Sequence, residues 1–464
     1  MRKDLGRRAA AVIGLAAGLS LAAAVPGCRV RNPYHEIARR LLERGLADRG
    51  AFSILQKILA VGPRLTGSPQ AEAAVAASFQ LLKDMGFDNV HLEPVEVVRW
   101  IRGPKEEARL LSGAGRTIAL DVCALGGSVG TPAAGLKARV LEVRSFEELG
   151  RAGDRARGRI IFFNRSWDHS LQETFAAYGP MAQQRSRGAV EAARAGGVAA
   201  LVRSASTSED DFPHTGLMNY ENGTPAVPAA ALSPKSADRL SVALKLDPDA
   251  LFELVQGSRT EGTVLSSNVV ADITGTEKPE EVILLGGHLD SWDLGTGAHD
   301  DGAGCSQAVE ALRLIRSLSL KPRRTVRAVL FMDEEFGGTG GRAYARSERR
   351  ASERHLAAVE SDRGGFFPLG IGLGDSRTFP GLAKWEPVLR SAGLGWLRAG
   401  GGGVDIGPLA ESGTVLGGLV PDSQRYFDVH HGALDVIGAV NARELELGAV
   451  ALAALAYVLA QEGI

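Results

Sequence analysis

The chain carries the stretch VILLGGHLDSWD at residues 282–293 and, soon afterwards, HDDGAG at residues 299–304. The apolar run 282–285 is typical of a buried β-strand, and a histidine and several carboxylates crowd in directly after it. Carboxylates repel one another, so this crowding needs a compensating charge, which a divalent metal ion commonly supplies. The stretch therefore predicts a metal site at the end of a strand, with further ligands elsewhere in the chain.

From residue 267 onward, strand patterns and helix patterns alternate along the chain. Strands are expected near residues 282–285, 326–332 and 356–360, and helices near 304–318, 338–349 and 442–459. Such alternation predicts an α/β fold with a mixed, mostly parallel sheet that is flanked by helices on both faces.

Further side chains of metal-ligand type follow the other expected strands or come late in the chain. They are Asp333, Glu334 and Glu335 after 326–332, Asp362 after 356–360, and His430 and His431. In open α/β sheets ligands bind beyond the carboxyl ends of the strands, so these segments should meet near His288. Imidazoles and carboxylates suit zinc, and their number suits two ions roughly 3.5–4 Å apart that share one carboxylate.

Composition places the chain among ordinary globular proteins. It has 464 residues, of which 45% are hydrophobic and 23% charged, which is enough for two domains with a large core. The formal net charge of -1 gives no reason to expect nucleic-acid binding. The cysteines Cys123 and Cys305 fall in regions assigned to different domains, so no disulfide is expected, and Cys305 is interpreted as a small buried residue.

The middle of the chain differs from both ends. Residues 109–265 show short strands, many glycines and prolines, one clear helix near 181–195, and no cluster of metal-ligand type. We interpret this stretch as a mostly-β domain inserted into a main domain that is formed by residues 29–108 and 266–464. Within the insertion, His214 is expected at the surface.

The N-terminus has the pattern of an export signal. Basic residues precede an apolar run at 9–25, which is too short to span a membrane and ends at Pro26, Gly27 and Cys28. Residues 1–28 are therefore expected to be a signal peptide, and Cys28 is a candidate for lipidation in a lipobox; plain cleavage is the alternative. The protein is expected to be exported: periplasmic, anchored in the outer membrane through Cys28, or extracellular.

Taken together, these motifs resemble the zinc peptidases of family M28, most closely the carboxypeptidase branch of that family. The resemblance covers nearly all of the chain after the signal. It is carried by GPRLTGS (62–68), VHLEPV (90–95), GAVEAA (188–193), GGHLDSWD (286–293), ESD (360–362), YF (426–427) and HH (430–431). It implies a zinc exopeptidase fold in which the insertion resembles a protease-associated domain.

The resemblance also implies a role for each site residue. Asp300 bridges two zinc ions; His288 and Asp362 complete one site, and Glu335 and His431 the other. His431 is chosen over His430 because the last ligand of the family stands four residues before an acidic residue, here Asp435. Glu334 is the general base, Asp290 orients His288, and Asp301 shapes the turn after Asp300.

The implied activity is hydrolysis of short peptides or dipeptides by a metal-bridging hydroxide, with Glu334 taking its proton. An aminopeptidase with the same metal site is the first alternative, and a non-catalytic, receptor-like binding module is the second. The resemblance also implies that the protein forms a homodimer.

Overall fold

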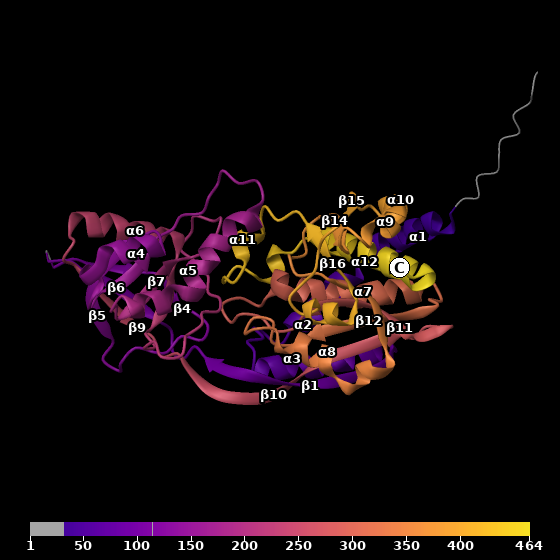
Figure 1. Ribbon diagram of the computed structural model, residues 1–464, viewed down its shortest axis with the longest axis horizontal. Coiled ribbons are helices and arrows are strands. Elements are labelled where there is room, and N and C mark those ends of the chain that lie inside the picture. Colours follow the sequence, from indigo (N-terminus) through magenta and orange to yellow (C-terminus); the bar gives the residue numbers. More distant parts are fainter. Residues whose placement is uncertain (1–31, 114) are drawn as a thin grey trace, which may run out of the picture.

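The chain folds around two eight-stranded β-sheets, which Figure 1 shows at opposite ends of the long axis. The computed structural model describes residues 32–113 and 115–464. The expected signal peptide at 1–28, including Cys28, lies outside the described residues.

The first sheet has the strand order β1-β10-β12-β11-β13-β16-β14-β15. Its strands are β1 (Asp88–Ile101), β10 (Arg259–Ile273), β11 (Lys278–His288), β12 (Arg324–Phe331), β13 (Arg354–Glu360), β14 (Pro368–Leu373), β15 (Trp396–Arg398) and β16 (Val415–Pro421). The central strands β12, β11, β13 and β16 are parallel, and antiparallel pairs flank them on both sides. The predicted mixed sheet with a parallel centre is therefore confirmed.

The central strands are mostly apolar because both faces of the sheet are covered, although β12 also carries the buried Arg327, which pairs with Asp272. On β11, Ile283 and Leu285 point into a large core with the long helices, whereas Leu284 points into a smaller core with Tyr344 and Ile406 on the other face. Both cores exclude water from the strands, so the strand ends are held rigidly.

Helices cover both faces of the first sheet. They are α1 (Pro33–Asp48), α2 (Gly50–Leu59), α3 (Pro69–Asp84), α7 (Ala303–Ser317), α8 (Thr339–Arg346), α9 (Phe379–Leu382), α10 (Glu386–Ser391) and α12 (Ala442–Glu462). The short helix α11 (Tyr426–Val429) instead packs through Phe427 against Phe175 and Tyr178, which lie outside this sheet. Helix α12 starts where the Asn441 side chain accepts the backbone N–H groups of Arg443 and Glu444.

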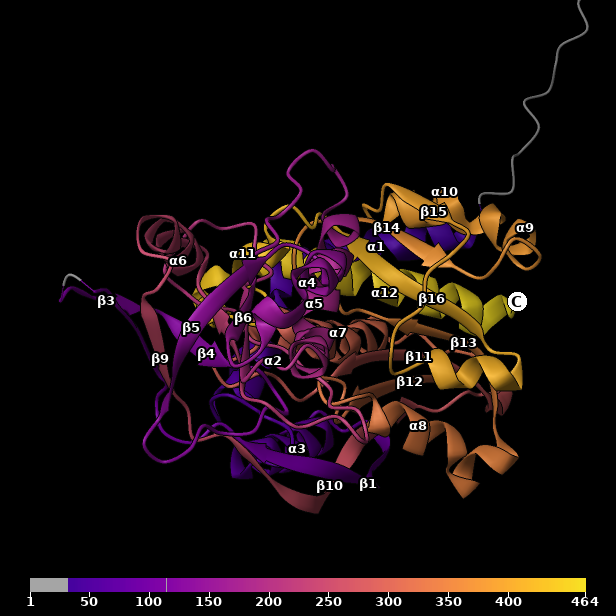
Figure 2. The ribbon, with the colours of Figure 1, turned by 60° about the vertical axis from the view of Figure 1, so that its left-hand side comes forward.

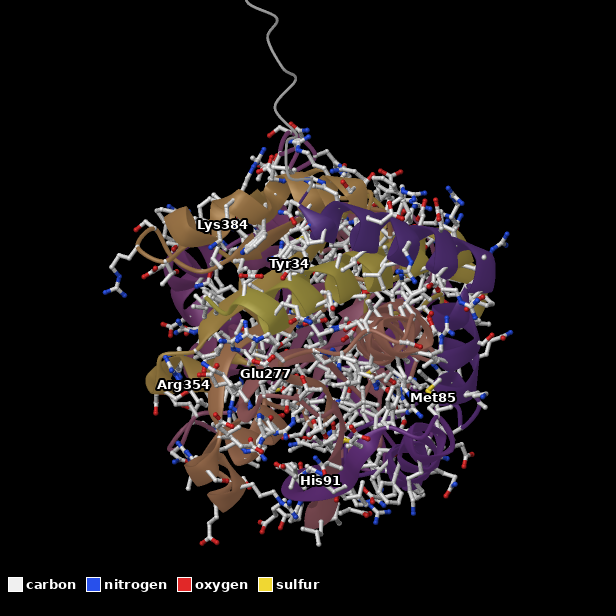
Figure 3. The ribbon with its side chains drawn as sticks, turned by 90° about the vertical axis from the view of Figure 1, so that its right-hand side faces the viewer. Tyr34, Met85, His91, Glu277, Arg354 and Lys384 are labelled. Carbon is white, nitrogen blue, oxygen red and sulfur yellow. The ribbon has the colours of Figure 1, made fainter. Side chains whose placement is uncertain are left out.

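Helix α12 is the one helix, among the described residues, that is long and apolar enough to span a membrane. Since 89% of its most apolar window is buried inside the protein, it is a core helix here. Figure 3 views this end of the molecule, where α1 lies over α12 and Tyr34 makes edge-on contacts with Trp385 and Tyr457.

The second sheet has the order β3-β2-β9-β5-β6-β7-β8-β4. Its strands are β2 (Glu107–Leu111), β3 (Thr117–Leu120), β4 (Val122–Ala124), β5 (Leu136–Val143), β6 (Ile160–Phe163), β7 (Ala199–Arg203), β8 (Ala229–Leu232) and β9 (Leu251–Val255). Three helices accompany it: α4 (Phe146–Ala152), α5 (Thr174–Arg194) and α6 (Pro234–Leu246). This part of the chain is therefore richer in helix than the mostly-β composition we expected.

The two sheets are joined by two adjacent strands. The chain leaves the first sheet at the end of β1 and returns at the start of β10, and Ile101 pairs with Arg259 across this antiparallel ladder. Figure 2 shows β1 and β10 running together along the lower edge of the molecule. We call residues 102–258 the inserted unit and the rest of the described chain the main unit.

Candidate metal centre

The parallel centre of the first sheet brings three segments to one edge. His288 ends β11, Glu334 and Glu335 follow β12, and Asp362 follows β13. Because these strands are neighbours with the same direction, their carboxyl ends lie side by side. The edge thus collects side chains that are far apart in the sequence.

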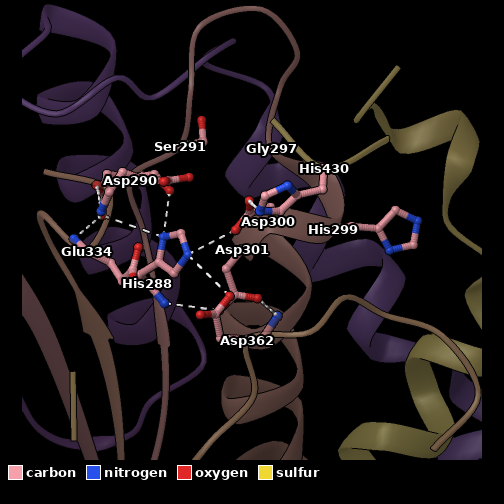
Figure 4. Close-up of polar contacts among 12 residues, drawn as sticks. His288, Asp290, Ser291, Gly297, His299, Asp300, Asp301, Glu334, Asp362 and His430 are labelled. Atoms are coloured by element: carbon pink, nitrogen blue, oxygen red, sulfur yellow. Dashed lines mark hydrogen bonds and ion pairs between the residues drawn. The ribbon is translucent and has the colours of Figure 1, made fainter. Parts of the chain in front are cut away.

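Asp300 lies between two imidazoles and presents a different oxygen to each. Its Oδ1 is 3.2 Å from Nε2 of His288, and its Oδ2 is 3.1 Å from Nε2 of His431. Asp362 Oδ1 lies 3.5 Å from the same His288 nitrogen, and Figure 4 shows His288 between Asp300 and Asp362. This is the arrangement of a carboxylate that bridges two positively charged centres.

The second half of the cluster is formed by His431 and Glu335. The Oε2 atom of Glu335 is 3.2 Å from Nε2 of His431 and also accepts a hydrogen bond of 2.6 Å from the indole of Trp292. This hydrogen bond fixes the carboxylate of Glu335. His431 has a positive φ of 60°, an uncommon conformation for a residue other than glycine that is often found at functional sites.

The charges within the cluster are unbalanced. Burial disfavours the charged rings, yet the surrounding carboxylates outweigh it and hold the pKa of His288 and of His431 well above the usual range. Burial and mutual repulsion raise the pKa of Glu334, Glu335 and Asp362. More negative charge is gathered here than the protein itself compensates.

The donor set fits divalent metal ions. Glu335 Oε1 is buried without any hydrogen-bond partner, which is costly unless something else satisfies it, and Asp300 Oδ2 is buried with only the rings of His430 and His431 beside it. Triplets of ligand atoms lie within 4.8 Å of one another, among them the set His288, Asp300 and Glu335. Imidazole and carboxylate in this proportion are zinc ligands.

Asp290 supports the cluster through backbone groups. Its carboxylate accepts the hydroxyl of Thr66 and the backbone N–H groups of Asp333, Glu334 and Glu335. Nδ1 of His288 lies 3.1 Å from the Asp290 carbonyl oxygen and 3.7 Å from its carboxylate. Asp290 thus contacts His288, as the sequence led us to expect, but its carboxylate mainly fixes the turn that carries the glutamates.

Two further acids hold the segment around Asp300. Asp301 accepts the backbone N–H groups of His288 and Gly304, which matches its expected place in the turn. Asp435 accepts the backbone N–H groups of His299 and Asp300, and burial, reinforced by the nearby Asp300, raises the pKa of Asp435 to about 7. Both carboxylates satisfy backbone donors and thereby orient Asp300.

Arg64 is a positioning residue that sequence reasoning missed. It is fully buried, and its guanidinium donates to the carbonyl oxygens of Leu289, Thr296 and Gly297. These carbonyls belong to the loop between His288 and Asp300, so Arg64 sets the shape of that loop. The GPRLTGS motif drew attention to Arg64 without indicating this contact.

The other histidines have different environments. His430 stacks on His431 with ring centroids 3.6 Å apart, and its Nε2 lies 3.6 Å from Asp300 Oδ2. His299 stacks on Phe366, away from the carboxylates. Our expectation for His214 was wrong: it is buried, and its Nδ1 contacts the carbonyl oxygen of His430 at 2.6 Å because its loop packs against the main unit.

A cavity of about 380 Å³ opens onto the cluster. Its lining residues are Phe175, Tyr178, Arg185, Leu217, Asp300, Glu334, Glu335, Gly337, Asp362, Val404, Tyr426, His430 and His431. Glu334 is half-buried and lines this space beside Glu335. A larger cavity, of about 530 Å³, includes none of the clustered residues.

The inserted unit forms one wall of this cavity and also contacts His431 directly. Phe175, Tyr178, Arg185 and Leu217 belong to it. The backbone of Thr215 donates its N–H to the carbonyl oxygen of His431, and the carbonyl oxygen of Thr215 lies 3.3 Å from Nδ1 of that ring. No motif in the sequence pointed to these residues, because the contacts join distant parts of the chain.

Comparisons with known proteins agree with this geometry. Residues 268–367 match the profile of Peptidase family M28. Carboxypeptidase Q from Bos taurus is 35% identical over 432 residues, which cover 92% of this chain and 89% of that protein. Carboxypeptidase Q from Homo sapiens is 36% identical over 401 residues, covering 86% of this chain and 83% of that protein.

Solved structures show the same similarity. A peptidase M28 precursor from Shewanella amazonensis SB2B superposes with a TM-score of 0.88 at 36% identity and covers 93% of this chain and 98% of that one. BSAP, a zinc aminopeptidase from Bacillus subtilis, gives a TM-score of 0.65 at 18% identity over 89% of this chain and 96% of that one, which shows a shared fold.

Proposed function

The chain belongs to peptidase family M28 and is a zinc exopeptidase, and on this premise we propose that it binds two zinc ions and hydrolyses dipeptides or other short peptides. Asp300 would bridge the ions, with His288 and Asp362 on one and Glu335 and His431 on the other. Glu334 would act as the general base.

One observation carries the two-ion proposal. The two oxygens of Asp300 each face a different imidazole, at 3.2 Å from His288 and 3.1 Å from His431. A carboxylate that served a single ion would not need a histidine on each side. Asp301, by contrast, uses its oxygens on backbone N–H groups, which supports a structural role for it.

The chemistry divides between the metal and the protein. Zinc, when bound, polarises the carbonyl of the scissile bond and lowers the pKa of water. Glu334 faces the same cavity and lies next in sequence to the ligand Glu335, so it is placed to take a proton from the attacking water. The same carboxyl group then returns the proton to the leaving amine.

Metal analysis tests the proposal. Protein purified without chelators should contain about two zinc ions per chain. Dialysis against a chelator should abolish peptide hydrolysis, and added zinc should restore it. A fully folded, zinc-loaded protein that hydrolyses none of a panel of free and blocked dipeptides would contradict the enzymatic assignment and favour a binding module.

Two modes of action use the same metal site. In an aminopeptidase the free N-terminus of the peptide is recognised, whereas in a carboxypeptidase or dipeptidase the free C-terminus is recognised. The relatives named carboxypeptidase Q are similar over most of the chain, and we therefore propose the second mode. N-acetylated and C-amidated dipeptides distinguish the modes, since each removes the charge that one mode needs.

Export, lipidation of Cys28 and homodimer formation stay predictions. The basic and apolar pattern of residues 1–28 supports export. Fractionation of producing cells, a Cys28→Ala variant and light scattering of the purified protein test the three points separately.

A further inference from the structure

We propose that Arg185 of the inserted unit binds the free C-terminal carboxylate of the peptide and thereby makes the enzyme selective for peptides with an unblocked C-terminus. This inference rests on the proposed hydrolytic function and names the substrate class of the same site. Four observations about this one side chain carry it.

The position of Arg185 is the first observation. It lines the cavity that holds Glu334, Glu335 and the two imidazoles, although it stands on α5 in the inserted unit. Among the described residues that line this cavity, it is the only lysine or arginine. A carboxylate of a bound molecule therefore has one guanidinium to meet in this cavity.

The lack of a partner is the second observation. Within residues 32–113 and 115–464, no carboxylate forms an ion pair with Arg185, and its buried Nε has no hydrogen-bond partner. Other arginines with little exposed surface have carboxylate partners: Arg102 pairs with Asp293, and Arg327 with Asp272. Arg185 is half-buried, and its buried Nε is costly to leave without an acceptor unless a ligand supplies one.

The nearest polar contact does not satisfy Arg185. Its Nη1 lies 3.5 Å from Nδ1 of His431. At this distance the contact is long for a hydrogen bond, and Nδ1 also faces the carbonyl oxygen of Thr215 at 3.3 Å. The remaining N–H groups of Arg185 are therefore available to a ligand.

The fourth observation is that the guanidinium is held in place. It lies over the ring of Tyr178, 5.5 Å from the centroid, and packs so closely against Gly216 that a Cβ there would lie 2.5 Å from its Cζ. A planar, fixed guanidinium matches a carboxylate with two parallel hydrogen bonds.

The chemistry of a peptide fits this position. The C-terminal carboxylate of a dipeptide is only a few bonds from the scissile carbonyl, and Arg185 adjoins His431, a proposed ligand of the metal that receives that carbonyl. A peptide that continues beyond the leaving residue, or one whose C-terminus is an amide, offers no carboxylate at this position. Arg185 then stays unpaired. Selectivity then arises because a peptide without a free C-terminal carboxylate cannot form this ion pair.

The test compares three peptides on zinc-loaded protein: Ala-Leu, Ala-Leu-NH2 and Ala-Glu-NH2. Wild type should cleave Ala-Leu with a kcat/KM about 100-fold above that for Ala-Leu-NH2. Arg185→Gln should lose about 100-fold on Ala-Leu, mainly through KM, and change little on Ala-Leu-NH2. Arg185→Lys, which keeps the charge without the planar fork, should recover part of the loss.

Arg187→Gln is the matched control, because Arg187 stands on the same helix but is exposed and paired with Glu191. It should leave all three rates unchanged. Equal loss on Ala-Leu and Ala-Leu-NH2 in Arg185→Gln would show a structural role and overturn the proposal. Ala-Glu-NH2 cleaved as well as Ala-Leu would assign Arg185 to a side-chain carboxylate and overturn it as well.

A binding measurement separates this inference from the proposed hydrolysis. Calorimetry with N-acetyl-leucine and N-acetyl-leucinamide needs no turnover. Tighter binding of the acid to wild type but not to Arg185→Gln supports the carboxylate role even for a protein that cleaves no peptide. Equal binding of the two compounds to wild type contradicts it, whatever the peptidase activity.

Discussion

At the scale of single residues, the centre depends on carboxylates with different neighbours. Asp290 and Asp301 are saturated by backbone N–H groups, whereas Glu335 keeps a buried oxygen without a hydrogen-bond donor and the Asp300 carboxylate faces imidazoles. Saturated carboxylates build the loops, and unsaturated ones are free to bind a cation. The distinction depends on three-dimensional contacts, since all four are acids in similar sequence surroundings.

Glu334→Gln tests the general base. The amide keeps the size of the side chain but cannot take a proton, so kcat should fall by about 100- to 10,000-fold. Zinc content and thermal midpoint should stay at the wild-type level, because Glu334 is not a proposed ligand. Retention of most of the wild-type kcat would remove Glu334 from this role.

Asp300→Ala tests the bridge. Loss of the shared ligand should reduce the zinc content from about two ions per chain to one or fewer, and leave repelling histidines and carboxylates behind. Metal analysis by mass spectrometry checks the stoichiometry. Asp249→Ala, an exposed acid in the inserted unit, serves as the control. Full zinc occupancy in Asp300→Ala would contradict a bridging role.

At the scale of elements, the sequence predicted the buried strands best. Strands β11, β12 and β13 are covered on both faces, so each contains an apolar run, which in β12 is interrupted only by Arg327. The first half of β10, with exposed polar residues such as Thr263, has no such run and was assigned to the insertion. Its place in the sheet comes from its pairing with β1, which no local pattern reveals.

The residues of the candidate site also differ in whether the sequence predicts them. Residues next to the ends of apolar strands, such as His288 and Asp362, were predictable because strand ends converge in this fold. Arg185, Tyr178 and Thr215 were not, because they reach the site from a separate unit through packing. An arginine in the middle of a helix looks like any solvated side chain until its neighbours are known.

Helices α7 and α12 contain a buried pair of acids away from the centre. Glu446 accepts the backbone N–H of Ala51, while Glu310 is bound by Arg313, which also contacts Asp48. Burial, reinforced by repulsion from Glu310, raises the pKa of Glu446 from 4.5 to about 8. The folded state therefore holds a proton that the unfolded chain releases at lower pH.

This arrangement predicts a loss of stability with rising pH. Folding raises the pKa of Glu446, so below pH 4.5 the carboxyl group is protonated in both states and does not change stability. Between pH 4.5 and about 8 the unfolded chain has lost this proton and the folded chain has not, so the free energy of unfolding falls as the pH rises. Glu446→Gln cannot ionise; its melting temperature relative to wild type should therefore increase between pH 5 and pH 9. Calorimetry at fixed ionic strength measures this difference. The exposed Glu411→Gln should show a constant difference, and a constant difference for Glu446→Gln would contradict the prediction.

At the scale of the whole molecule, the two units share the site. Gly126, in the inserted unit, packs against Trp292 of the main unit, and the indole of Trp292 donates to Glu335. A Cβ at Gly126 would lie 1.9 Å from the Trp292 ring. A change in the inserted unit therefore reaches a proposed metal ligand through one intervening side chain.

Gly126→Ala tests this connection. The added methyl group must displace Trp292, which should cost about 1–3 kcal/mol of stability and weaken zinc binding about 10-fold. Zinc competition with a chelating dye and thermal unfolding report the two effects. Gly150→Ala, in α4 with open space around it, should change neither zinc binding nor, beyond a small gain, stability. Unchanged zinc affinity in Gly126→Ala would show that the units act independently.

The pairing of Ile101 with Arg259 places both ends of the inserted unit on neighbouring strands. Genetic exchange of everything between these two positions would leave the hydrogen-bond ladder of the first sheet intact. The hydrolytic centre and the choice of peptide terminus can therefore be inherited from different ancestors. The loop at Thr215 limits such exchange, because each new insert must again offer a carbonyl group to His431.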